Sequence, residues 1–356
     1  MRSLQSMSVP QRRFIWLTFF VGGLLLLVAL FILLSFGSLN SASRKPGTPL
    51  LPGVTVREFA ALPDDDAYPP AVAVSADGTV YTGSFASGTV WAISPDGSQI
   101  IEVPGTRDGI GAVSALAPLP DGSLLVLDVN DTDPRTAGGQ VVRVQNGVVT
   151  LYAKPGDGQG FIAPNDMTLT PDGALYVTDG GHNEVWRFET NTAGAGEGSV
   201  WWVAPALAGS EQPRAFLTGI AYDPAHEALL MTDPGTNTIY RTMLANGSTE
   251  AVYQHGNRAY PPGFDGLTVM PDGTIFVAAL GQNGIARVDG NELFYIAGLF
   301  RGGSDVEHDG LGRLFVPNFD QSSLVIPMIQ PQLPFALDVI ETGVLPTPQP
   351  AATATS

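Results

Sequence analysis

The chain has 356 residues and contains no cysteine. This absence excludes disulfide bonds, thiolate metal sites, a cysteine nucleophile and a lipid-modified cysteine anchor. Histidine is scarce, with four residues, and charged residues make up only 14% of the chain. The sequence also lacks a Gly-x-Ser-x-Gly elbow, a Walker loop and a His-Glu-x-x-His pair. The corresponding serine-hydrolase, nucleotide-hydrolase and zinc-protease chemistries are therefore not expected.

Acidic residues are missing from the first 45 residues, which hold five of the 17 Lys and Arg residues. The remainder carries 12 basic and 34 acidic residues, a formal balance of −22. A domain this acidic repels phosphate backbones, so we expect no binding to nucleic acid. Acidity alone usually serves solubility, and it gives no catalytic signal.

No stretch of helical periodicity of normal length occurs between residues 50 and 330. A short apolar run ending in a turn occurs instead six times. The copies begin at Ala71, Ala115, Asp166, Gly219, Gly266 and Asp305. Most are followed by a second strand and by a third with its own recurring pattern. Self-similarity of this kind, built only of strands at a period of about 40–50 residues, predicts an all-β, six-bladed β-propeller of four-stranded blades.

The turns and the outer strands support this prediction. Asp77-Gly78 and the equivalent Asp-Gly pairs suit a tight turn, because Gly accepts a positive φ freely and Asp tolerates it. Ser323–Ile326 matches the third-strand pattern of the sixth repeat, but no convincing fourth strand follows it. Because residues 56–60 resemble the fourth strands of other repeats, we predict that this early segment completes the sixth blade and closes the ring without a covalent link.

The chain begins with a long apolar segment. Residues 14–36 contain no charged side chain and are long enough to cross a bilayer. A cleaved signal peptide is the alternative, with Ser41-Ala42-Ser43 as its cleavage site, but signal segments are usually shorter. The positive-inside bias places the amino terminus in the cytoplasm and the propeller outside the membrane.

The sequence thus predicts five regions. They are a cytoplasmic terminus (1–13), a transmembrane anchor (14–36), a linker (37–53), a propeller (54–330) and a Pro-rich tail (331–356).

The first strand of each propeller blade lines the central channel, so the residues at which these strands start converge at one mouth. Counting back from each turn, or matching the apolar pattern, gives the ring positions Pro70, Ser114, Asn165, Thr218, Asp265 and Ser304. Carboxylate, amide and hydroxyl oxygens of this kind suit a hard cation such as Ca²⁺.

The segments around Asn165 (Ala163-Pro-Asn-Asp-Met-Thr-Leu-Thr-Pro-Asp-Gly) and Asp265 (Phe264-Asp-Gly-Leu-Thr-Val-Met-Pro-Asp-Gly) resemble the senescence marker protein/gluconolactonase/luciferin-regenerating enzyme family. The resemblance covers roughly residues 54–330 at the level of repeats. It implies a six-bladed propeller with an axial divalent cation, commonly Ca²⁺, that assists hydrolysis of lactones or phosphoesters.

In that family a Glu, two Asn and an Asp hold the ion. Asn165 matches one family Asn, and Asp265 matches the Asp. Pro70 stands in place of the Glu and Thr218 in place of the second Asn. The resemblance therefore implies Asn165, Asp265 and Thr218 as ligands, with less negative charge among the ligands than is usual in the family.

Further polar residues occupy the ends of the second strands, among them Ser84, Asp128, Asp179, Asp233 and Asn318. The favoured interpretation of each is turn capping by its own side chain. His182 follows Asp179 closely and is the best placed general base, with Asp166 as a supporting group. Strand alternation sends the side chains of Glu307 and His308 to opposite faces, so we do not expect them to act as a pair.

The favoured hypothesis is a membrane-anchored, gluconolactonase-like propeller that hydrolyses lactone or related ester bonds with a divalent cation. A non-catalytic, extracytoplasmic propeller that binds a ligand or a protein partner, for example through residues 130–139, is the alternative. Pro70 favours this alternative, because it removes an acidic partner of Asp265.

Overall fold

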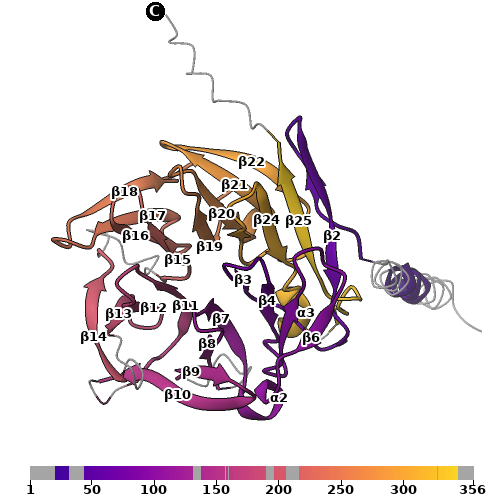
Figure 1. Ribbon diagram of the computed structural model, residues 1–356. Helices are drawn as coiled ribbons and strands as arrows, with labels where there is room; N and C mark the ends of the chain where they lie inside the picture. Colours follow the sequence, from indigo (N-terminus) through magenta and orange to yellow (C-terminus); the bar gives the residue numbers. More distant parts are fainter. Residues whose placement is uncertain are drawn as a thin grey trace, which may run out of the picture.

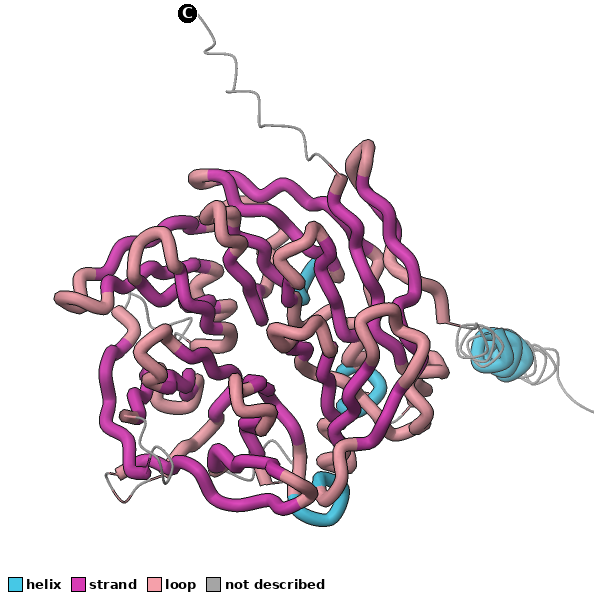
Figure 2. The backbone as a smooth tube through the Cα atoms, in the orientation of Figure 1, coloured by secondary structure: helices cyan, strands magenta, loops and turns pink. Residues whose placement is uncertain are grey.

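The computed structural model describes residues 21–31, 44–130, 138–156, 158, 160–189, 196–205, 216–326 and 328–343. Six antiparallel blades surround a central axis in these residues (Figure 1). The tube in Figure 2 shows the same closed ring of strands joined by loops. The predicted six-bladed propeller is therefore confirmed. Of residues 130–139, the loop named as a possible binding surface, residues 131–137 lie outside the described residues.

Each blade has four strands. Blade 1 contains β3 (Val72–Val74), β4 (Val80–Gly83), β5 (Val90–Ile93) and β6 (Ile100–Glu102). Blade 2 contains β7 (Val113–Pro118), β8 (Leu124–Asp128), β9 (Gln140–Gln145) and β10 (Val148–Pro155). Blade 3 contains β11 (Pro164–Leu169), β12 (Leu175–Asp179), β13 (Glu184–Phe188) and β14 (Gly196–Val203). A parallel pairing of β10 with β14 joins the outer edges of blades 2 and 3.

Blade 4 contains β15 (Ile220–Asp223), β16 (Ala228–Asp233), β17 (Thr238–Met243) and β18 (Thr249–Gln254). Blade 5 contains β19 (Phe264–Val269), β20 (Ile275–Ala279), β21 (Gly284–Asp289) and β22 (Glu292–Gly298), with β1 (Thr48–Pro49) added at its edge. Blade 6 contains β23 (Glu307–His308), β24 (Arg313–Pro317), β25 (Ala336–Thr342) and β2 (Val54–Ala61). Short helices α2 (Thr106–Gly109), η2 (Leu280–Gln282) and α3 (Gln321–Val325) lie in the connections.

The Asp-Gly pairs form the turns between first and second strands. Gly78 and Gly273 have φ angles of 85° and 84°, a backbone conformation that a side chain disfavours. The Asp77 carboxylate accepts the Thr79 N–H at 3.0 Å, and the Asp272 carboxylate accepts the Thr274 N–H at 2.9 Å. Gly supplies the turn backbone and Asp closes the turn, which explains why this dipeptide marks the repeats.

Strand β2 closes the ring as predicted, because it is the outer strand of blade 6 although it precedes blade 1 in the chain. It pairs with β25 from Val54 opposite Thr342 to Ala61 opposite Ala336. The first and last parts of the propeller are thus joined by backbone hydrogen bonds, which leaves no open end to the array of blades.

The prediction of residues 323–326 as the third strand of blade 6 was wrong. Ser323–Ile326 belongs largely to helix α3, and the third strand is β25, which pairs with β24. A long connection, residues 318–335, separates β24 from β25, whereas the other blades with fully described connections have short ones. The propeller consequently extends to Thr342, beyond the predicted boundary at residue 330. The predicted linker is also shorter, because residues 44–49 contact blades 5 and 6.

Apolar side chains fill the spaces between neighbouring blades. The third-strand residues Trp91, Trp186 and Tyr240 are all buried, as their repeated position predicts. Trp91 of blade 1 lies in one cluster with Phe315 and Phe335 of blade 6. Burial of this surface holds the blades in fixed positions around the axis.

Residues 21–31 form a helix with exposed side chains. Among the described residues, none of the helices combines the length and the apolar character needed to cross a bilayer. The rest of the predicted anchor, residues 14–20 and 32–36, lies outside the described residues.

The corrected third strand makes Phe335 a core residue. We expect Phe335→Ala to lower the free energy of unfolding by about 3–5 kcal/mol, because it leaves a cavity between buried aromatic side chains. Leu333→Ala, at a partly exposed position in the same connection, serves as the control and should change stability little. Urea denaturation measures both. Equal, small effects would mean that a tail begins at residue 331 after all.

Candidate axial site

The starts of five first strands meet at one mouth of the channel. Pro70, Ser114, Asn165, Asp265 and Ser304 line a cavity of about 20 Å³, together with Asp166, Gly266 and Asp305. A volume of this size holds about one water-sized species. The structure therefore brings Asn165, Asp166 and Asp265, three of the predicted site residues, to a single small cavity on the axis.

Thr218 does not line this cavity. Its side chain is buried, with Oγ1 3.0 Å from Thr232 Oγ1 and 3.4 Å from the carbonyl oxygen of Phe264. The prediction of Thr218 as a ligand position is therefore not supported by its placement. Blade 4 lacks the Asp-Gly turn that set the register in other blades, and the apolar pattern alone did not show which way this hydroxyl points.

The two serines of the ring hold neighbouring blades together. Ser114 Oγ donates to the carbonyl oxygen of Asn165, and Ser304 Oγ donates to that of Pro70, both at 2.6 Å. Both hydroxyl groups thus donate their hydrogen bonds to a neighbouring blade. Within the described part of the chain, no residue forms a hydrogen bond with the Asp265 carboxylate or with the Asn165 side-chain amide. These two groups are the ones that the fold leaves available to a ligand.

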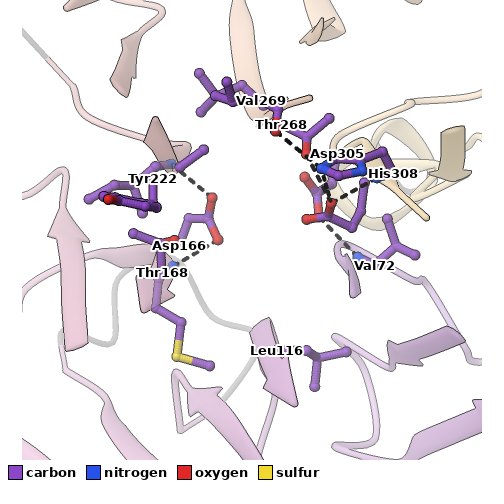
Figure 3. A pocket seen from close by; sticks show the side chains of 14 residues that line it. Val72, Leu116, Asp166, Thr168, Tyr222, Thr268, Val269, Asp305 and His308 are labelled. Atoms are coloured by element: carbon purple, nitrogen blue, oxygen red, sulfur yellow. Dashed lines mark hydrogen bonds and ion pairs between the residues drawn. The ribbon is translucent and has the colours of Figure 1, made fainter. Parts of the chain in front are cut away.

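Asp166 and Asp305 occupy equivalent positions in blades 3 and 6, and Figure 3 shows them on opposite sides of the channel. The Asp166 carboxylate accepts the N–H of Met167 at 2.7 Å and that of Ile220, in blade 4, at 2.9 Å. The Asp305 carboxylate accepts the N–H of Val306 at 2.8 Å and that of Val72, in blade 1, at 2.9 Å. Each carboxylate therefore bridges one blade to the next.

Gly266 makes room for one of these bridges. A Cβ atom at this position would lie 2.0 Å from Asp305 Oδ1. Because heavy atoms do not approach so closely, a side chain at 266 would displace the carboxylate from the channel wall. The bridge from Asp305 in blade 6 to Val72 in blade 1 therefore requires glycine at position 266 of blade 5.

A second cavity, of about 170 Å³, lies further along the first strands. Its lining includes Asp166, Asp305, Glu307, His308 and Thr268 (Figure 3). Glu307 and His308 both line it, contrary to the alternation expected from the sequence, because β23 is only two residues long. Sequence reasoning did not identify Glu307 as an axial carboxylate.

Hydrogen bonds fix the orientations of Glu307 and His308. Glu307 Oε1 accepts the Thr268 hydroxyl at 2.9 Å and the His308 N–H at 2.7 Å. His308 Nδ1 accepts the Gly310 N–H at 2.9 Å, so the proton of the neutral ring belongs on Nε2, 3.1 Å from the Val269 carbonyl oxygen. With both ring nitrogens engaged, His308 is a structural residue rather than a base.

Four carboxyl groups gather along the axis. Burial raises the pKa of Asp166 and Asp265 well above the usual value, and the charge of Asp305 raises both further. Burial also raises the pKa of Asp305 and Glu307 to about 7. Neither cavity is lined by a Lys or Arg of the described residues. The four carboxyl groups must therefore retain protons or be neutralised by a cation.

His182 lies outside both cavities, so the structure does not bring it together with Asn165 and Asp265. Its Nδ1 is 3.0 Å from Asp179 Oδ2, and the same carboxylate accepts the N–H groups of Ile162 and Ala163 at 2.8 Å. Asp179 Oδ1 also accepts the N–H of Gly181 at 2.9 Å, which is the turn capping predicted for Asp179.

A similar pair forms in another turn, where His226 Nδ1 is 2.8 Å from Asp223 Oδ2. Asp223 and His226 lie at the turn between β15 and β16, which contains no ring residue. The Asp-His pair at a spacing of three residues is therefore a feature of turns and not of the axial site.

The donor set at the mouth fits a hard cation with few protein ligands. No three His, Asp or Glu side chains among the described residues are grouped so that they could hold a metal ion together. Asp265 and Asn165 do supply a carboxylate and an amide oxygen around a cavity of ionic size. Ca²⁺ accepts such oxygens and completes its shell with water.

Part of the chain that contains Asn165 and Asp265 matches a known protein family. The model of the SMP-30/Gluconolactonase/LRE-like region matches residues 106–294, just over half of the chain. Among curated proteins, no sequence matches the chain significantly.

Solved structures show the same fold. A gluconolactonase from Xanthomonas campestris is 14% identical, with a TM-score of 0.61, over 85% of this chain and 96% of its own. Regucalcin from Agrobacterium tumefaciens, described as calcium-binding, is 15% identical, with a TM-score of 0.55, over 81% and 93%. A catalytically inactive variant of virginiamycin B lyase from Staphylococcus aureus, solved with quinupristin, is 16% identical, with a TM-score of 0.54, over 81% and 99%. At these identities the similarity establishes the fold alone.

The contact between Gly266 and Asp305 can be tested by a double-mutant cycle. We expect Gly266→Ala to destabilise the propeller by about 1–3 kcal/mol, because the added methyl group displaces the Asp305 carboxylate. The same substitution should cost less in an Asp305→Ala background, where the obstructing oxygen is absent. Chemical denaturation of the four proteins measures the coupling. Strict additivity would show that the two positions do not interact.

The raised pKa values predict how stability changes with pH. A carboxyl group with a raised pKa binds its proton more tightly when folded, so its contribution to stability is lost as pH rises from about 4 toward the folded value of about 7. In chelator, stability should therefore fall between pH 5 and pH 8.

Glu307→Gln should make that fall smaller, because glutamine keeps an acceptor for Thr268 without the titration. Glu250→Gln, at an exposed position, is the matched control and should leave the fall unchanged. Urea unfolding at the two pH values measures it. If the stability of Glu307→Gln fell as much between pH 5 and pH 8 as that of the wild type, the raised pKa of Glu307 would be contradicted.

Proposed function

Because the chain belongs to the SMP-30/Gluconolactonase/LRE-like family, we propose that it is a divalent-cation-dependent hydrolase of lactone or related ester bonds. The reaction would take place at the axial mouth. The observation that carries the proposal is the Asp265 carboxylate, which faces a cavity of about 20 Å³ beside Asn165 and receives no hydrogen bond from the described residues. A half-buried carboxylate without a hydrogen-bond partner is costly, and a cation would offset that cost.

Asp265 and Asn165 would hold the cation, with water filling its other positions. When bound, a divalent cation polarises a substrate carbonyl and lowers the pKa of a bound water. The cavity is too small for an organic substrate, so the ester would lie at the mouth with its carbonyl oxygen directed toward the ring. Pro70 offers no side-chain oxygen and the Thr218 hydroxyl is turned away, so we expect weaker binding than in a site with four side-chain ligands.

Asp166 is the favoured proton acceptor. It lines the same cavity as Asp265, and the N–H groups of Met167 and Ile220 hold its two oxygens in place. Burial raises the pKa of Asp166, which makes its carboxylate a stronger base toward the proton of a water. In hydrolysis, Asp166 would take a proton from the attacking water and return it to the ring oxygen released when the carbonyl–oxygen bond breaks. His182 lines neither cavity, and its Nδ1 is 3.0 Å from Asp179 Oδ2, so we assign it no part in this step.

We also propose that residues 14–36 tether the propeller to a membrane, with the propeller on the extracytoplasmic side. The uncharged length of this segment supports a span. The chain then reaches the propeller through a buried ion pair between Arg44 and Asp338 of β25. The Gly47 N–H also donates to Asp338, at 3.0 Å. A cleaved signal peptide remains the alternative to this tether.

Cation binding and activity can be tested in the same variants. We expect millimolar Ca²⁺ to raise the melting temperature of the wild-type protein relative to chelator, because a ligand that binds only the folded state stabilises it. Asp265→Asn should abolish this shift and reduce lactone hydrolysis to background, because it removes the carboxylate ligand.

Asp96→Asn changes a carboxylate in an exposed turn and should behave as wild type. If neither the Ca²⁺ shift nor hydrolysis of a lactone panel distinguishes wild type from Asp265→Asn, the hydrolase proposal is wrong. The propeller would then be a non-catalytic binding module.

A further inference from the structure

The loops around the axial mouth expose large apolar side chains to solvent. From them we propose that this face docks on a lipid bilayer, an inference that rests on the membrane tether proposed above. The apolar rim consists of Phe216, Tyr260, Leu299, Val325 and Ile326, all of them exposed. Exposed apolar side chains that share one face of a folded domain can meet another apolar phase together.

The topology places the whole apolar rim on the mouth side. First strands start at the mouth and second strands end there, so loops that enter a first strand or leave a second strand lie on this face. Phe216, Tyr260 and Leu299 lie in loops before β15, β19 and β23, and Val325 and Ile326 follow β24. On the opposite face, Leu311 lies exposed in a turn and Val148 at the start of β10, and further exposed apolar residues such as Ile101 lie on the outer strands. The loops of the mouth nevertheless carry five exposed apolar residues, more than the turns of the opposite face.

Two residues of the apolar rim adopt an unfavourable backbone conformation. Tyr260 and Leu299 have φ angles of 58° and 60°, in a region that bulky side chains avoid. They lie at equivalent positions, each five residues before a ring residue, Asp265 and Ser304 respectively. Their side chains are 80% and 75% exposed. Strained backbone that directs apolar groups into solvent at two equivalent positions indicates a surface role rather than a folding role.

The attachment of the amino-terminal segment lies at the same face. Arg44 and Gly47 contact Asp338 in the mouth-side half of β25, and β1 pairs with Gly298 at the mouth-side end of β22. Residues 37–43 separate this attachment from the apolar segment and span at most about 25 Å when extended. A bilayer that holds residues 14–36 therefore lies within reach of the apolar rim.

The negative charge of the protein determines which lipid headgroups this face can approach. With a formal net charge of −17, the chain is repelled by anionic headgroups. Docking must therefore depend on the apolar side chains, and Tyr260 suits the interface because tyrosine is favoured at headgroup depth. A zwitterionic phosphatidylcholine surface is the appropriate probe.

The absence of cysteine allows each face to be labelled at a single site. The full chain is reconstituted in phosphatidylcholine vesicles that carry a nitroxide near the headgroup. One variant bears a fluorophore on Val325→Cys and the matched control bears it on Leu311→Cys, which is 85% exposed on the opposite face. We expect the label at 325 to lose most of its fluorescence to the nitroxide and the label at 311 to retain it.

A second variant separates docking from folding. Tyr260→Gly combined with Leu299→Gly removes two side chains of the apolar rim where glycine suits the backbone. The melting temperature should not fall, but the label at 325 should escape quenching.

Vesicle flotation distinguishes the ways in which the inference can fail. If the protein does not float with the vesicles, the tether and the docking face are both wrong, whereas the cation-dependent hydrolase is tested independently by the Ca²⁺ shift. If the protein floats but the labels at 325 and 311 are quenched equally or not at all, the docking face alone is wrong. The apolar rim would then serve a protein partner or a second copy of the chain.

Discussion

The pairing of β2 with β25 closes the ring of blades and thereby holds every other blade in place. Without it, blade 6 would lack its outer strand, and the ring would have two open sheet edges. Closure fixes the angular position of every blade, and only then do residues as distant in the chain as Pro70 and Ser304 meet. The same sheet contains Asp338, which fastens the amino-terminal segment through Arg44. Ring closure and the attachment of the amino-terminal segment thus share one blade.

Closure also concentrates negative charge on the axis. Asp166 and Asp305 each accept a backbone N–H from the following blade, so these carboxylates secure two opposite seams. Asp265 has no such bond from the described residues, and its pKa rises because burial and the two neighbouring charges oppose its ionisation. The structural carboxylates therefore place Asp265 where a bound cation would offset the opposed ionisation. Stability and ligand binding are coupled through the same small space.

The sequence predicted the repeats, the turns and the closing strand, because Asp-Gly pairs and strand periodicity are local signals. It also brought Asn165 and Asp265 to one mouth, since counting from those turns preserves register. It failed where this local register was missing. Thr218 could not be placed by counting back from an Asp-Gly turn, because blade 4 has none. Glu307 lies in a first strand of only two residues, so alternation did not show which way its side chain points. A long connection separates β25 from β24, so that strand was not recognised from its pattern. Which oxygen faces the axis depends on contacts between blades, and these become visible only when the ring is closed.

Cation binding at the axial mouth through Asp265 and Asn165 can be seen directly in a crystal structure of the protein grown with Ca²⁺ and, separately, with a lanthanide that scatters anomalously. We expect a single anomalous peak on the axis, about 2.3–2.6 Å from oxygens of both side chains in the Ca²⁺ form. A mouth that contains only water under both conditions, with Asp265 bonded to a neighbouring residue instead, would contradict it.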